Sequence, residues 1–112
     1  NTNIYYLRKL FNKLLNEKRE HAKSRIQIRI DHLTQQIQSA AVPDDVSNHA
    51  LRPLQLAMQR LDDLQGIAEI HQEITEAANL EEDGYEVINN NIEQQQAQQK
   101  AAQAKATEKC QC

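Results

Sequence analysis

The chain has 112 residues, a length that fits one domain at most. Hydrophobic residues make up 39% of it, Gly and Pro occur twice each, and Trp is absent. A β-sandwich or an α/β domain needs turn residues roughly every 8 to 12 positions. The composition therefore excludes these classes and favours a few long helices.

The net charge of −3 hides an uneven distribution of charge along the chain. Residues 1–41 carry eight Lys and Arg against three acids, and residues 42–93 carry two Arg against twelve acids. Residues 94–112 have a net charge of +2. Neighbouring segments of opposite charge are typical of helices that pair with one another or with a charged partner.

The chain starts with Asn-Thr-Asn rather than Met, so we expect a piece of a longer protein or a processed product. No signal-peptide pattern opens it, and no run of about 18 apolar residues predicts a membrane span. A cytoplasmic location is favoured, without a signal that assigns it.

The first predicted helix spans residues 4–41, which contain neither Gly nor Pro. Its apolar residues recur at spacings of three and four, the pattern of a helix that packs along a partner as in a coiled coil. Polar residues interrupt this pattern near residues 18–22, which predicts a local shift in the supercoil. The core positions assigned to this helix are Leu7, Phe11, Leu14, Ile26, Ile30, Leu33 and Ile37.

The sequence Pro-Asp-Asp at residues 43–45 predicts the end of the first helix, because proline disfavours helical geometry in the residue before it. The two aspartates and Ser47 can cap a second helix by accepting hydrogen bonds from its free N–H groups. We expect this second helix over residues 45–80. A short link turns the chain back, so the two helices should be antiparallel neighbours.

The second helix contains two residues that are unusual inside helices. Pro53 either opens the helix or kinks it, and we favour an early start with a kink. Gly66 is expected to lie within the helix at a cost of about 1 kcal/mol. The core positions assigned to this helix are Leu54, Met58, Leu61, Leu64 and Ile74.

A second break is predicted at Asp83-Gly84, because Asp-Gly is a turn signal and a carboxylate follows three residues later, as in a capping box. A third helix is expected over residues 84–100. Beyond Ile92 only Ala is available for packing, so we predict that residues 101–112 form a fraying tail rich in Gln and Ala. A docking surface for an absent partner and a disordered tail are the alternatives.

Together these elements predict an all-α fold. It consists of a long antiparallel helical hairpin, coiled-coil-like, with a third C-terminal helix, and the three helices form an elongated bundle. Residues 1–100 are expected to be a single helical domain. Tyr6, Phe11 and Tyr85 are expected to be the larger residues of an otherwise aliphatic core.

The sequence contains no constellation that indicates catalysis or a cofactor. There is no Gly-rich phosphate loop and no pairing of a nucleophile with a base. The four His lack the i, i+4 spacing of a zinc pair, and His71 is expected to be partly buried. The carboxylates of residues 62–86 are expected on a solvated face, because acid–base catalysis needs a partly dry pocket. We therefore expect no enzyme, no cofactor and no metal.

The chain ends in Cys110-Gln-Cys112, which we interpret first as a pair without a function. An interchain disulfide formed by these cysteines is the main alternative. The ending also resembles the lipidation signal of Rab-type small GTPases, but no GTPase motif accompanies it. Two cysteines alone cannot complete a structural zinc site.

The basic residues of the first helix have two interpretations. Charges that flank an apolar stripe opposite an acidic helix set pairing and orientation in coiled coils, and we favour this interpretation. The alternative is contact with a nucleic-acid backbone. The candidate nucleic-acid contacts are Arg8, Lys9, Lys13, Arg19 and Lys23.

These observations predict a non-catalytic helical interaction module that mediates self-association or the docking of a protein partner. The alternative is a helical accessory domain that contacts nucleic acid within a larger DNA-processing protein. Nucleic acid is the less favoured partner, because only the basic cluster supports it.

Overall fold

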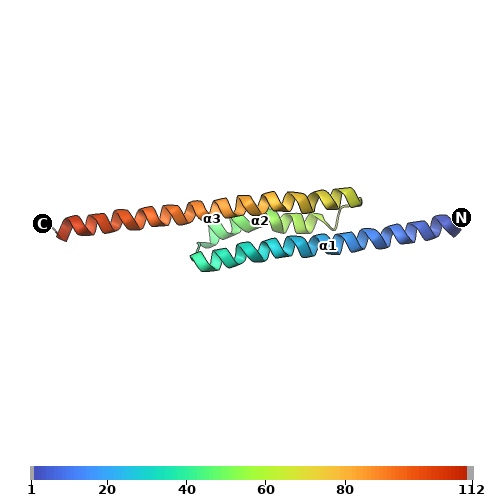
Figure 1. The fold of residues 1–112 in the computed structure, drawn as a ribbon, viewed down its shortest axis with the longest axis horizontal. Helices are drawn as coiled ribbons and strands as arrows, with labels where there is room; N and C mark the ends of the chain where they lie inside the picture. The colour runs from blue at the N-terminus through green and yellow to red at the C-terminus, as the bar shows by residue number, and fades with distance from the viewer. Residues whose placement is uncertain (1, 111–112) are drawn as a thin grey trace.

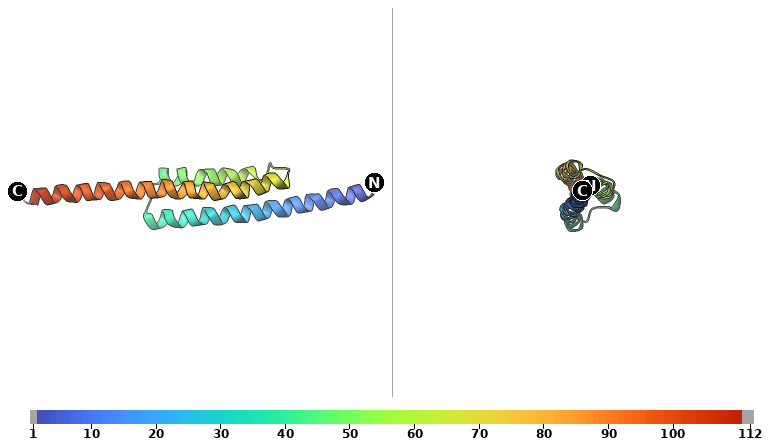
Figure 2. Two further views of the ribbon diagram at one scale, coloured as in Figure 1. Left: turned by 45° about the horizontal axis from the view of Figure 1, so that its top comes forward. Right: turned by 90° about the vertical axis from the view of Figure 1, so that its right-hand side faces the viewer.

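The structure is a computed structural model that describes residues 2–110, with side chains described for residues 3–100. It contains three helices, α1 (Thr2–Ala40), α2 (Asp44–Arg60) and α3 (Ile67–Cys110), and the molecule measures 92 × 17 × 16 Å (Figure 1). α1 and α3 run in the same direction and α2 runs antiparallel to both (Figure 1). Seen along the bundle axis, the three helices occupy the corners of a triangle (Figure 2). The predicted elongated three-helix bundle is confirmed.

The connection between α1 and α2 lies where the sequence predicts it. The N–H of Val42 donates to Ile37 O at 3.2 Å and that of Ala41 to Gln38 O at 3.4 Å, which is the Schellman arrangement of a helix end. Ala41 occupies the position with positive φ that usually favours Gly, at 51°. Val42 is buried beside this turn and fixes the direction in which the chain leaves α1.

α2 begins at Asp44 and contains Pro53, so the early start of this helix is confirmed. The predicted side-chain cap is not made, since Pro43 occupies the N-cap position. The hydroxyl of Ser47 instead donates back to Pro43 O at 2.9 Å. Asp44 and Asp45 lie in the first turn, where their negative charge interacts favourably with the helix dipole.

The second connection differs from the prediction. It lies at residues 61–66, so α2 ends at Arg60, and α3 continues through the predicted break at Asp83-Gly84. The expected helices over 45–80 and 84–100 are therefore wrong in this region. Arg19 of α1 explains part of the difference: its Nε donates to Leu61 O at 2.8 Å and its Nη2 to Leu64 O at 2.6 Å. These carbonyls follow the end of α2, where helical partners are lacking, so a contact from α1 stabilises the turn.

Gly84 provides close packing within α3 rather than a turn. A Cβ atom on this residue would lie 2.8 Å from Leu33 Cδ1 and 3.3 Å from Ala50 O. No glycine of the described residues has a positive φ. The small size of Gly84 therefore lets α3 approach α1 and α2 at the same level, which explains why the Asp-Gly signal does not end the helix.

We expect Gly84→Ala to destabilise the protein, although Ala exceeds Gly in helix propensity by about 1 kcal/mol. Overpacking of a tight core costs about 1–3 kcal/mol, and here the contacts are a fully buried Leu and a backbone carbonyl. Gly66→Ala is the control, because its Cβ would meet only the exposed side chain of Glu69, at 3.2 Å. Urea unfolding of both variants tests the prediction. A Gly84→Ala variant more stable than Gly66→Ala would contradict it.

The core runs from Leu15 of α1 to Ile92, just beyond the middle of α3. Among the predicted core positions, those fully buried are Ile26, Leu33, Leu54 and Leu61. Those that are partly buried and pack against the core are Ile30, Ile37, Met58, Leu64 and Ile74, and Tyr85 joins them.

The prediction of core positions is wrong near the start of α1. Leu7, Phe11 and Leu14 are exposed, as is Tyr6. The cause is the second connection: the turn at residues 61–66 lies beside Arg19, so neither α2 nor α3 reaches far enough to cover the first turns of α1. The sequence does show the apolar pattern of this part of α1, but no helix of the described residues covers it.

Candidate functional site

Both long helices extend beyond the bundle, at opposite ends of the molecule (Figure 1). We call residues 2–14 of α1 the N-terminal overhang, because Leu15 is the first buried core residue of this helix. We call residues 93–110 of α3 the C-terminal overhang, because Ile92 is the last residue of α3 that packs against the core. The two differ in composition: the first is apolar and basic, and the second consists largely of Gln, Ala and Lys.

The N-terminal overhang exposes a dense group of hydrophobic side chains. Seven large hydrophobic residues are between 40% and 68% exposed: Ile4, Tyr5, Tyr6, Leu7, Leu10, Phe11 and Leu14. Elsewhere in the described part of the chain, the large hydrophobic residues with comparable exposure are Ile28 and Leu56. Single exposed hydrophobic residues are ordinary, whereas a contiguous group marks a binding surface.

Four of these residues form one line along the helix. Ile4, Leu7, Phe11 and Leu14 follow a spacing of three, four and three residues, and we call them the overhang stripe. Leu15, the next residue, already faces the core. Successive residues of an α-helix are turned by about 100°, so the overhang stripe and the bundle core face different directions. The irregularity in the apolar pattern, expected near residues 18–22, is therefore found at Leu14 and Leu15, where α1 enters the bundle.

The N-terminal overhang is also positively charged. It carries Arg8, Lys9 and Lys13, and residues 1–16 contain no acid. Among the described residues these three cations make no ion pair, in contrast to cations further along α1. An apolar stripe accompanied by cations is therefore the distinctive chemical feature of this end of the molecule.

The candidate nucleic-acid contacts fall into two groups in the structure. Arg8, Lys9 and Lys13 lie on the N-terminal overhang. Arg19 is engaged with the turn at residues 61–66. Lys23 Nζ lies 2.9 Å from Asp62 Oδ1, and this hydrogen bond raises the pKa of Lys23. The structure therefore does not bring the five together as one basic surface.

Opposite charges between helices are matched within the bundle. Besides the Lys23–Asp62 pair, Arg29 of α1 binds Glu81 of α3, and Arg60 of α2 lies 3.3 Å from Glu73 of α3. On α3, the carboxylates of Glu73 and Glu81 accept these contacts from α2 and α1. Two of the five cations of α1 within the bundle, Lys23 and Arg29, are thus paired with acidic residues of the chain itself.

The least exposed acid of the bundle, Glu81, has a structural role. Its side chain is 11% exposed and accepts a hydrogen bond from Arg29, while His32 Nδ1 lies 3.3 Å from its second oxygen. Burial, and then the charge of Glu81, raise the pKa of Tyr85. Both partners of Glu81 lie on α1, so this cluster connects α1 to α3. It is not part of the groove described next.

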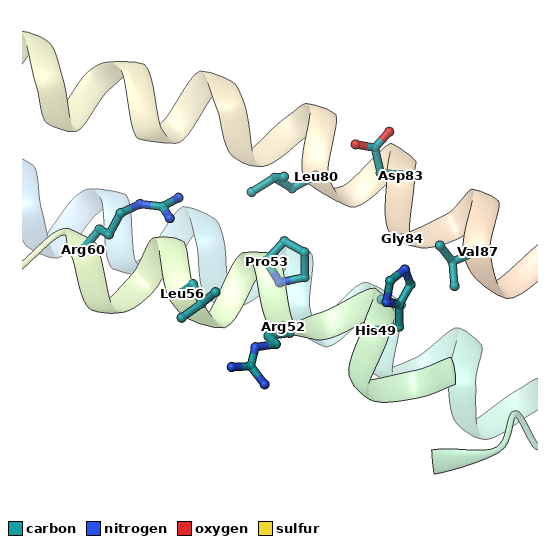
Figure 3. A pocket seen from close by; sticks show the side chains of 10 residues that line it. His49, Arg52, Pro53, Leu56, Arg60, Leu80, Asp83, Gly84 and Val87 are labelled. Carbon is teal, nitrogen blue, oxygen red and sulfur yellow. The ribbon is translucent and has the colours of Figure 1, made fainter. Parts of the chain in front are cut away.

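A groove of about 520 Å³ lies between α2 and α3 (Figure 3). Its apolar lining comes from Pro53, Leu56, Leu80 and Val87, and charged residues occur at its edges. Asp83 is the one acid among its lining residues. The groove therefore offers mainly apolar contacts, and its charged or titratable lining residues are His49, Arg52, Arg60 and Asp83.

The remaining predictions concern metal, cysteine and membrane. The described residues contain no group of three or more His, Cys, Asp and Glu that could hold a metal ion. His71 is exposed rather than partly buried, with Nδ1 3.2 Å from Lys18 Nζ. The side chain of Cys110 and the whole of Cys112 lie outside the described part, so the interchain disulfide stays a prediction. Within residues 2–110, no helix has a segment long and apolar enough to cross a lipid bilayer.

The sequence pattern identified the residues of the N-terminal overhang but assigned them to the core. What it lacked was the extent of the neighbouring helices, because periodicity shows which face of a helix is apolar and not what covers that face. Comparison of the chain with protein-family models, with curated proteins and with solved structures gives no match.

Proposed function

We propose that this chain is a non-catalytic helical interaction module, and that the N-terminal overhang binds a helix of another protein. The observation that supports this most directly is the exposure of seven large hydrophobic residues within residues 4–14, all on a helix that the bundle holds in place. Three of them are the aromatic residues Tyr5, Tyr6 and Phe11, a type that frequently anchors protein interfaces.

The energetics of the overhang favour a helical partner. An isolated helix of this length is only marginally stable in water, but here α1 continues into the bundle and is already nucleated. When a second helix docks here, this chain therefore loses little backbone conformational entropy. Burial of a Leu, Ile or Phe side chain contributes about 1.5–3 kcal/mol, so the overhang stripe supplies enough apolar contact for a specific complex.

A second candidate function is contact with single-stranded nucleic acid. The overhang places three cations within the same turns as three aromatic rings, and bases can stack on such rings while phosphates bind the cations. We favour this function less, because Arg19 and Lys23 are engaged within the bundle and because the aliphatic stripe has no role in it. A steep decrease of affinity with salt would indicate it.

The proposed function is tested with a synthetic peptide of about three heptads that has Leu and Ile in its apolar stripe and Gln on both flanks. We expect the labelled peptide to bind the full chain in fluorescence anisotropy, and to lose binding when Leu7→Ser and Phe11→Ser are combined. Leu56→Ser, which changes an exposed hydrophobic residue of the groove, is the matched control and should leave binding unchanged. Binding that survives the double substitution, or no binding to the unchanged chain, would refute the proposal.

A further inference from the structure

The N-terminal overhang also carries information about the chemistry of its partner. We infer that the helix bound there is acidic as well as apolar, with carboxylates beside its apolar stripe. This inference rests on the proposed function, and it adds which class of helix is selected. Three observations support it.

The first observation is the position of the cations around the overhang. On a helix with 3.6 residues per turn, Arg8 lies at one edge of the overhang stripe, Lys9 lies opposite the stripe, and Lys13 lies next to Lys9. A helix that covers the stripe therefore has Arg8 beside one of its edges and the other two cations within two turns of it. Charges at such an edge select partner and orientation in paired helices.

The second observation is how α1 meets its neighbours inside the bundle. Lys23 binds Asp62 in the turn after α2, and Arg29 binds Glu81 of α3. Residues 67–99, the part of α3 that precedes Lys100, contain eight acids and neither Lys nor Arg. Within the bundle, two cations of α1 are thus paired with acids of the chain. The overhang continues the basic character of α1, and its three cations make no ion pair among the described residues, although Glu17 follows Lys13 by one turn.

The third observation is that a second copy of the chain does not offer a suitable surface. Two overhangs laid together would oppose three cations to three cations, with no acid in either. The apolar groove between α2 and α3 is lined by Arg52 and Arg60, so it is also unsuited to a basic helix. The C-terminal overhang has Ala but no large hydrophobic residue for a stripe. A helix from a different, acidic protein fits the charges better.

The test compares two further peptides that share the apolar stripe of the Gln-flanked peptide and differ only in their flanks, one with Glu and one with Lys. At about 50 mM salt we expect the Glu-flanked peptide to bind the full chain about tenfold more tightly than the Lys-flanked peptide, the sum of several exposed ion pairs. In the Arg8→Glu, Lys13→Glu variant the preference should reverse. Arg25→Glu with Arg52→Glu, which alters two exposed cations of the bundle, should retain the original preference.

The outcomes separate this inference from the proposed function. Equal binding of the Glu-flanked and Lys-flanked peptides, with loss of both in the Leu7→Ser, Phe11→Ser variant, would refute the inference and leave the proposed function intact. Absence of binding by all three peptides would refute both. A preference that the Arg8→Glu, Lys13→Glu variant does not change would also refute the inference, because the selecting charges would then lie elsewhere.

Two other occupants are outcomes of the same series of measurements. Light scattering at two concentrations, with and without reductant, should give the monomer mass of 12.9 kDa. A dimer that survives reductant and is lost in the Leu7→Ser, Phe11→Ser variant would identify a second copy as the occupant and refute the inference. Single-stranded DNA that displaces the Glu-flanked peptide, with an affinity that falls steeply with salt, would refute it in favour of nucleic acid.

Discussion

Replacement of Leu33 by Ala is expected to lower the free energy of unfolding by about 2–5 kcal/mol. Leu33 is fully buried, and its side chain occupies the place where Gly84 lets α3 approach α1. Removal of the side chain leaves a cavity between all three helices. Gly84, which faces this position, has no side chain that could fill the cavity.

Leu7→Ala is the matched control for this substitution. The two leucines belong to the same helix and to the same predicted apolar pattern, but Leu7 is 60% exposed. We expect its replacement to change stability by no more than about 0.5 kcal/mol. Urea unfolding followed by circular dichroism measures both values. Equal losses in the two variants would mean that the overhang is covered in solution, most simply by a second copy.

Arg19→Met is expected to cost about 1.5–3 kcal/mol, the usual contribution of hydrogen bonds that involve a charged group. Met retains the apolar stem of the side chain and removes the donors to Leu61 O and Leu64 O. The loss should be concentrated at the turn between α2 and α3. Hydrogen exchange is therefore the more specific measurement: amides of residues 61–70 should exchange faster, while those in the middle of α1 change less.

The control for this prediction is Arg25→Met. Arg25 lies on the same helix, is exposed, and has no hydrogen bond or ion pair among the described residues. Its substitution should leave both the midpoint of unfolding and the exchange of residues 61–70 unchanged. If Arg19→Met behaves like Arg25→Met, the turn is determined by its own sequence and not by the contact from α1.

The fold class followed from features that act locally. Scarce Gly and Pro, and apolar residues at spacings of three and four, are sufficient to predict a few long helices, and Pro43 marked the end of the first. The second connection could not be located in the same way. Gly66 and Gly84 look alike in sequence, but one precedes α3 and the other permits close helix packing. The difference depends on contacts with Arg19 and Leu33, which lie far away in the chain.

For the candidate site, too, some features follow from the sequence and others do not. The apolar and basic residues of the first turns were recognised, and their spacing was correct. Their exposure was not predictable, because it depends on where α2 ends, at a turn that Arg19 of α1 contacts from a distant part of the chain. Leu14 is exposed and Leu15 is buried for the same reason. Which face of α1 is buried depends on where the other two helices pack, and the apolar pattern of α1 alone does not show this.

The parallel course of α1 and α3, with overhangs at opposite ends, has a mechanical consequence. A force that pulls residue 2 and residue 110 apart is directed along the helices and slides α1 against α3. All side-chain layers between these helices then resist at the same time, whereas two helices pulled apart from one end would separate one layer after another. The packed core resists such sliding because its side chains interdigitate. Pulling on the two ends therefore loads the contacts between α1 and α3 in shear.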